Sequence, residues 1–86
     1  MKPFALLVDY EVLDYIVRLR RRQGDAIRQR MLQIRDSPGN FADEMEADES
    51  GRLYHVHFFS GHAIQYWIDD ADRQVKIMRI RPSIRP

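Results

Sequence analysis

Hydrophobic and polar positions alternate most regularly between Arg52 and Arg81, where three apolar runs are divided by two turn signals. In the first run, one set of alternating positions is Tyr54, Val56 and Phe58 and the other is His55, His57 and Phe59. In the second run, the sets are Ile64, Tyr66 and Ile68, and Ala63, Gln65 and Trp67. A period of two in aromatic and β-branched residues predicts half-buried strands. We therefore expect an antiparallel meander.

The turn at Ser60-Gly61 allows two registers between the first two strands. A two-residue loop places Val56 on the same face as Gln65 and Trp67, whereas a three-residue loop, Ser60 to His62, pairs Phe59 with Ala63. Only the longer loop aligns both apolar sets on one face, and burial of one consistent face favours that register. We therefore predict the three-residue loop. His55 and His57 are then expected beside Gln65 and Trp67, on the face where we expect function.

The first residues of the chain predict a strand and then a helix. Phe4 to Val8 is a continuous apolar run, which is typical of a strand buried on both faces. Asp9 is a suitable helix cap, and an amphipathic stripe follows it at Val12, Tyr15, Ile16 and Leu19. Arg20 to Arg22 are expected in the last turn of this helix, with Gly24 ending it.

A second helix is predicted from a cap at Asp25 to a firm stop at Ser37-Pro38-Gly39. Its apolar stripe is Ile27, Met31 and Ile34, with Arg28, Arg30 and Arg35 outside it. Two helices joined by so short a turn are expected to form an antiparallel hairpin.

The acidic segment Asn40 to Gly51 is expected to be an irregular edge strand followed by a loop, since charges on an edge deter unwanted pairing. Pro82 is expected to end the last strand, because it cannot donate to the ladder. The predicted order is β-α-α-β-β-β-β, an α+β fold in which the helical hairpin packs on a mostly antiparallel sheet in two layers. We expect a single domain over residues 1–86, with residues 82–86 as a short basic tail.

Composition limits the class of protein. Of 86 residues, 44% are hydrophobic and 31% charged, which is ordinary for a soluble globular protein. The absence of cysteine excludes disulfides and thiolate metal sites. No apolar run is long enough to span a membrane, and Met1-Lys2-Pro3 leads into a strand-like run rather than a signal peptide. We expect a cytoplasmic protein without a cofactor.

The net charge of +1 conceals a segregated pattern. Residues 18–35 hold seven arginines and one acid, residues 36–50 hold six acids and no base, and residues 73–86 hold four arginines and Lys76. Arginine pairs well with phosphate and carboxylate. The basic segments are either a solvated helix face with a basic tail, or a surface for an acidic partner or a nucleic-acid backbone. The arginines expected to bind a partner are Arg20, Arg21, Arg22, Arg28 and Arg30.

With this element order, the chain resembles the RelE/ParE superfamily, toxins of bacterial type II toxin–antitoxin systems that include plasmid-stabilisation proteins. The resemblance extends from Phe4 to about Arg81 and rests on the two short helices, the Ser37-Pro38 stop, and the segments YHVHF, GHAIQY and VKIMRI. It implies a cognate antitoxin that wraps around the protein. RelE-like members cut messenger RNA (mRNA) on the ribosome, and ParE-like members poison DNA gyrase.

The resemblance also implies candidate site residues. RelE-like ribonucleases carry two lysines where YHVHF has His55 and His57, and imidazoles there could transfer protons near neutral pH because their ordinary pKa is about 6.5. The arginine that grips phosphate in the family's glycine motif corresponds to Ala63. Catalytic candidates are therefore His55, His57 and His62. Candidates for phosphate or RNA contact are Arg52, Arg79, Arg81 and Trp67.

Each candidate also has a structural interpretation. The two strand histidines are ordinary polar residues of a sheet, catalytic or RNA-contacting groups, or antitoxin contacts. Trp67 and Phe59 either stack on bases or cover the sheet. A zinc site needs three or four ligands, and none is predicted. Three functions stay open: an mRNA endoribonuclease, a toxin acting by protein contact as ParE does, and a non-toxic relative that only binds an antitoxin.

Overall fold

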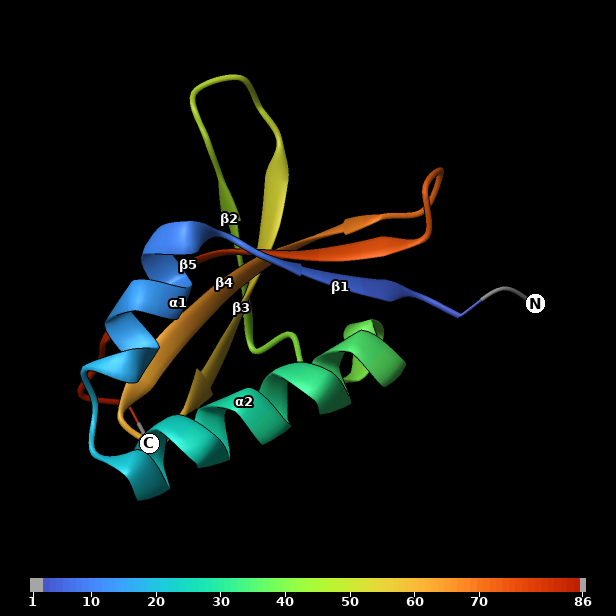
Figure 1. The fold of residues 1–86 in the computed structure, drawn as a ribbon. Coiled ribbons are helices and arrows are strands. Elements are labelled where there is room, and N and C mark those ends of the chain that lie inside the picture. Colours follow the sequence, from blue (N-terminus) through green and yellow to red (C-terminus); the bar gives the residue numbers. More distant parts are fainter. Residues whose placement is uncertain (1–2, 86) are drawn as a thin grey trace.

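The computed structural model describes residues 3–85, so the expectations for Met1, Lys2 and Pro86 lie outside the described residues. The elements are β1 (Ala5–Val8), α1 (Tyr10–Val17), α2 (Arg21–Asp36), a 3-10 helix η1 (Pro38–Asn40), β2 (Glu44–Ala47), β3 (Leu53–Phe59), β4 (His62–Asp69) and β5 (Gln74–Pro82). Both helices lie on one side of a twisted sheet (Figure 1). The predicted order and the two-layer α+β class are confirmed. Within residues 3–85, no helix is long and apolar enough to cross a membrane.

The five strands form one sheet in the order β1-β5-β4-β3-β2. β1 pairs in parallel with β5, and the other neighbours are antiparallel. The predicted meander, the acidic edge strand and the strand end at Pro82 are all present. The prediction that the first strand is buried on both faces is wrong, because β1 is an edge strand and Leu7 is 45% exposed.

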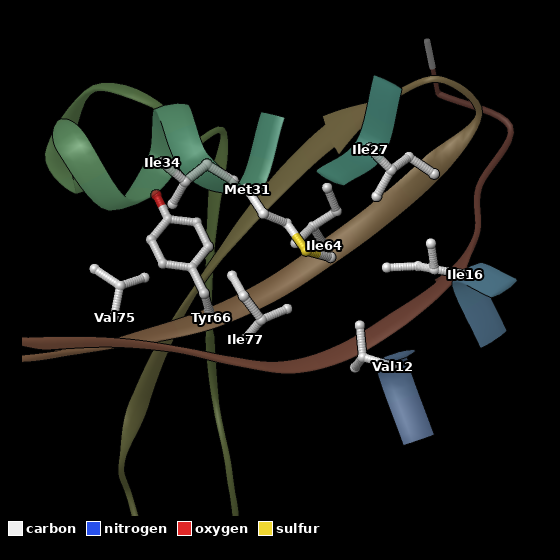
Figure 2. Close-up of a cluster of buried hydrophobic side chains, with 9 residues drawn as sticks. All are labelled: Val12, Ile16, Ile27, Met31, Ile34, Ile64, Tyr66, Val75 and Ile77. Carbon is white, nitrogen blue, oxygen red and sulfur yellow. The ribbon is translucent and has the colours of Figure 1, made fainter. Parts of the chain in front are cut away.

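The main core lies between the helices and the sheet (Figure 2). Its fully buried members are Val12, Ile16, Ile27, Met31, Ile34, Ile64, Tyr66, Val75 and Ile77. Tyr66 fills the end of this layer and donates its hydroxyl to the backbone oxygen of Pro38 at 2.6 Å. The aromatic ring thus packs as a hydrophobe while its polar atom is satisfied, as buried tyrosines usually require.

The boundary between the helices differs from the prediction. α1 ends at Val17, so Arg20 precedes α2 and Arg21 lies in its first turn, whereas the sequence pattern assigned them to the end of α1. Gly24 does not stop a helix but lies inside α2, where an added Cβ would be 3.1 Å from the backbone oxygen of Ile16. A side chain at this position would therefore require the neighbouring backbone of α1 to shift by a few tenths of an ångström. Asp25 pairs with Arg28 at 2.9 Å instead of capping.

The predicted strand register is also wrong. Phe59 pairs with His62, so the loop contains only Ser60 and Gly61. Both have positive φ, 52° and 72°, as a type I′ turn requires. This turn matches the twist of the strands. It fixes a register that differs from the one predicted from the apolar pattern alone. His57 is consequently opposite Ile64, and Val56 is opposite Gln65.

The register divides the sheet into two unlike faces. The helix-covered face carries His55, His57, Phe59, His62, Ile64 and Tyr66. The opposite face, called here the open face, carries Glu44 and Glu46 of β2, Tyr54, Val56 and Phe58 of β3, Ala63, Gln65 and Trp67 of β4, and Lys76, Arg79 and Arg81 of β5. The side chains of Val56 and Phe58 therefore do not pack against the helices, contrary to expectation. Val56 and Ala63 are nonetheless 0% and 1% exposed.

Candidate functional site

The three predicted catalytic histidines lie on the helix-covered side, each with its own partners. His62 is 5% exposed. Its Nδ1 is 2.9 Å from the carbonyl oxygen of Ser60, and its Nε2 is 2.8 Å from the hydroxyl of Tyr15. Because a carbonyl only accepts, Nδ1 donates to Ser60, and when the ring is neutral the tyrosine hydroxyl donates to Nε2. His62 therefore joins α1 to the β3–β4 turn.

His57, which is 8% exposed, lies between a cation and a carboxylate. Its Nε2 is 3.4 Å from Nη1 of Arg30, and its Nδ1 is 2.9 Å from Oδ2 of Asp43. A guanidinium only donates, so His57 accepts at Nε2 and donates from Nδ1. The backbone N–H of Phe58 donates to the same carboxylate at 2.8 Å. Chiefly that bond, with help from His57 and Arg30, lowers the pKa of Asp43.

Arg30 is partly buried, although the helix pattern placed it outside the apolar stripe, and its contact with a partner stays a prediction. Its guanidinium carbon lies 4.2 Å from the ring centre of Phe59 and 5.2 Å from that of Phe41. Its Nε is buried without a hydrogen-bond partner. Arg20, Arg21, Arg22 and Arg28 are exposed, as expected of partner-binding residues.

His55 is the most accessible of the three histidines, and it contacts the edge strand. Its Nδ1 lies 2.7 Å from the sulfur of Met45, and its ring meets the edge of Tyr66 at 5.2 Å. Burial lowers its pKa below the usual 6.5. Within residues 3–85, no three His, Cys, Asp or Glu side chains are grouped to hold a metal ion. The prediction that His55 and His57 face Gln65 and Trp67 is wrong, and their catalytic role stays a prediction.

The predicted RNA contacts do gather on the open face. At one end, the ring of Trp67 lies beneath two cations, with the Arg52 guanidinium 4.2 Å and the Lys76 ammonium 4.7 Å from its centre. Lys76 also pairs with Asp69 at 3.4 Å. This end combines an aromatic ring with positive charge, as sites for single-stranded nucleic acid do.

The other end of the open face is crossed by ion pairs between strands that are not neighbours. Arg81 of β5 reaches Glu46 of β2 at 3.0 Å, although β4 and β3 lie between them. Arg85, in the segment after β5, pairs with Glu44, and its guanidinium covers the ring of Phe58 at 4.9 Å. These two pairs connect the edge strand β2 to β5 and to the segment after β5, so the open face is partly closed by the protein's own charges.

Arg79 lies in the second half of β5, beyond the residues that pair with β1. It is exposed and lines a pocket of about 220 Å³ between α1 and β5, together with Glu11, Val12, Tyr15, Met78 and Ile80. Arg79 is the register partner of Gln65 on β4, which places it on the open face. Arg52, Arg79, Arg81 and Trp67 thus share one surface, and their contact with RNA stays a prediction.

Sequence reasoning missed the acidic residues of this region. Glu44 and Glu46 alternate with Met45 and Ala47, a period-two signal that places both carboxylates on one face. Which arginines these carboxylates pair with depends on how far the whole sheet twists, and the local sequence pattern gives no information on that twist. Asp43 was missed for the same reason, since its partner His57 is 14 residues away.

This architecture defines a class: a two-helix layer on one side of a five-stranded sheet, with basic and aromatic side chains on the other side. No family model matches the sequence, and no curated protein matches it. Solved structures do match this chain. The chain is similar to a chain of the RelBE2 toxin–antitoxin complex of Mycobacterium tuberculosis, with a TM-score of 0.79 and 16% identity over 94% of this chain and 99% of that one.

Two further structures agree. The archaeal RelE–RelB complex of Pyrococcus horikoshii gives a TM-score of 0.78 at 12% identity, covering 99% of this chain and 100% of that chain. A mutant of the E. coli toxin RelE in the free state gives 0.66 at 14% identity, covering 98% and 86%. At these identities the likeness establishes the fold, and the fold of this chain is that of the RelE toxins.

Proposed function

We propose that this chain is the toxin of a type II toxin–antitoxin system, neutralised by a cognate antitoxin. The observation that carries the proposal is the backbone likeness, which covers 94% and 99% of this chain in two structures solved as toxin–antitoxin complexes. The match also covers 99% and 100% of those two solved chains. The compartment we propose is the cytoplasm, where such a toxin meets its target.

The antitoxin surface we propose includes the start of α2. Arg20, Arg21 and Arg22 are exposed, and the Arg21 side chain is 95% exposed. Cations in the first turn interact unfavourably with the helix dipole, so they do not stabilise the helix itself. An acidic, amphipathic segment that is disordered when free would bind such a surface through charge and then order upon it.

The ligand class we propose for the open face is single-stranded RNA. Arg52, Lys76 and Arg79 supply positive charge, and Trp67 supplies a flat ring for stacking on bases. Cleavage of that RNA would need proton transfer. The carboxylates of Glu44 and Glu46 lie on this face, whereas the three histidines lie on the other side of the sheet.

A protein target, as for ParE-like toxins, is the second candidate. Ala63 is buried on the open face at 1% exposed, at the position where RNA-cutting relatives are expected to hold phosphate with an arginine. A toxin that acts by protein contact does not require that cation, so this substitution favours the alternative.

The test is induction of the wild-type chain in bacteria, alone and together with the product of the neighbouring reading frame, which we expect to be small and acidic. We expect growth arrest from the toxin alone, relief by the neighbour, and co-purification of the two. The matched negative control is Ile64→Asp, which places a charge in the core. Mapped mRNA ends identify RNA cleavage, and trapped gyrase–DNA complexes identify the second candidate. Absence of arrest from soluble, folded wild type would overturn the toxin proposal.

A further inference from the structure

Two carboxylates on β2 form ion pairs with two arginines at the open face. Glu46 holds Arg81 at 3.0 Å, and Glu44 holds Arg85. We propose that Glu44 and Glu46 are internal competitors for the polyanion that this face binds, so that RNA must displace them to reach Arg81 and Arg85. The inference rests on the proposed function, and it assigns to β2 a role in limiting access to the site.

The position of the two carboxylates supports competition. Glu44 and Glu46 are alternate residues of a strand, so they point to the same face and are roughly 7 Å apart along it. They present two negative charges in a row, as a nucleic-acid backbone does. The arginines on which they act belong to β5 and the segment after it, on the far side of β3 and β4.

The exposure of these side chains allows exchange with a ligand. Arg81 and Glu46 are 40% and 38% exposed, and Arg85 and Glu44 are 59% and 39% exposed. Ion pairs in contact with water contribute little to stability and are weakened by salt. A phosphate that pairs with the same guanidinium can therefore replace the carboxylate without unfolding the sheet.

The covering element is also an edge strand of the sheet. β2 has four residues and pairs with β3 alone, at the margin of the sheet. Edge strands of this length have few contacts that resist displacement. Movement of Glu44 away from Arg85 would release the guanidinium that lies 4.9 Å over Phe58. One event thus exposes both a cation and an aromatic ring, the two groups that hold a single-stranded nucleotide.

The experiment measures binding of a fluorescent single-stranded oligouridylate to purified wild type and to Glu44→Gln/Glu46→Gln. We expect the double variant to bind about tenfold more tightly, as removal of two exposed ion pairs allows. The plot of log affinity against log salt should become steeper by up to about 1.4, since the double variant has no displaced carboxylates to take up counterions while the two phosphates release theirs. Thermal unfolding of each protein verifies the fold.

The matched control is Glu49→Gln/Asp72→Asn, which changes net charge equally at two exposed positions away from the open face. An equal gain in affinity in this control would show general electrostatics and overturn the proposal. The gain from Glu46→Gln should also disappear when Arg81→Ala is present, because the competition acts through that arginine. Unchanged affinity in Glu44→Gln/Glu46→Gln overturns the proposal whatever the toxicity. Absence of growth arrest in cells overturns the toxin function and leaves this binding measurement valid.

Discussion

His57 donates the hydrogen of its Nδ1 to the carboxylate of Asp43 at 2.9 Å, while its Nε2 accepts from Arg30 of α2 at 3.4 Å. The imidazole thus bridges the residue before β2 and the second helix. A buried, fully bonded histidine of this kind holds elements together, and its removal leaves Arg30 without its acceptor.

Replacement of His57 by alanine is expected to destabilise the protein by about 2 kcal/mol, because two hydrogen-bonded groups lose their partner. Denaturant unfolding measures the change. The matched variant His55→Ala should cost less, since His55 contacts only Met45 and the edge of Tyr66. If His57→Ala retained full stability but abolished RNA cleavage in cells, the catalytic interpretation would gain over the structural one.

Asp43 is expected to make stability depend on pH in the acid range. Its pKa is lowered below the ordinary 3.8, chiefly by the backbone hydrogen bond from Phe58. A lowered pKa contributes stability that is complete above the ordinary value and is lost as pH falls through the folded-state value. Melting temperatures of wild type and Asp43→Asn should therefore differ at pH 7 and converge in strong acid. A difference independent of pH would contradict this assignment.

Tyr66 is expected to remain protonated well above the pH at which tyrosines usually ionise. Burial, aided by the charge of Asp43, raises its pKa from 10.0 to about 12. Because the unfolded chain ionises first, stability is complete below pH 10.0 and falls as pH rises toward 12. Absorbance titration of the phenolate should show a late transition that is absent from Tyr66→Phe. That variant also leaves the Pro38 carbonyl unpaired, at a cost of about 1 to 3 kcal/mol.

Gly24→Ala is expected to destabilise the protein, although alanine usually favours a helix interior by about 1 kcal/mol. The new Cβ would lie 3.1 Å from the Ile16 carbonyl oxygen and force α1 and α2 apart. Gly39→Ala is the control, since an added Cβ there meets nothing within 4 Å. A gain in melting temperature for Gly24→Ala would show that the helices separate without loss.

Association with the antitoxin is expected to slow when Arg21 and Arg22 are changed to glutamate. Both are exposed at the start of α2, so the reversal alters steering more than stability. Stopped-flow rates should fall roughly tenfold at low salt, and the two proteins should converge at high salt as charges are screened. If the association rate of the wild type did not change with salt, the arginine run would be a solvated surface without a role in steering.

Local pattern in the sequence was sufficient for the order of elements. Period-two alternation identified β3 and β4, and the stripes at Val12–Ile16 and Ile27–Ile34 identified two helices, because each signal lies within one element. The acidic edge strand was expected from its dense charge, without its alternation. The resemblance drawn from that order agrees with the fold of the solved RelE structures. Arg52, Trp67, Arg79 and Arg81 were named as candidates for RNA contact, but that they lie on one face follows only from the observed register.

Tertiary structure decided which face of the strands meets the helices. β3 carries apolar residues on both faces, so alternation alone could not choose between them, and the Ser60-Gly61 turn set the register instead. Buried histidines are tolerated beneath the helices because Tyr15, Arg30 and Asp43, all distant in sequence, satisfy their ring nitrogens. The pairing of Arg81 with Glu46 likewise depends on the twist of the whole sheet, since hydrogen bonds and ion pairs across 35 residues are specified only when the chain has folded.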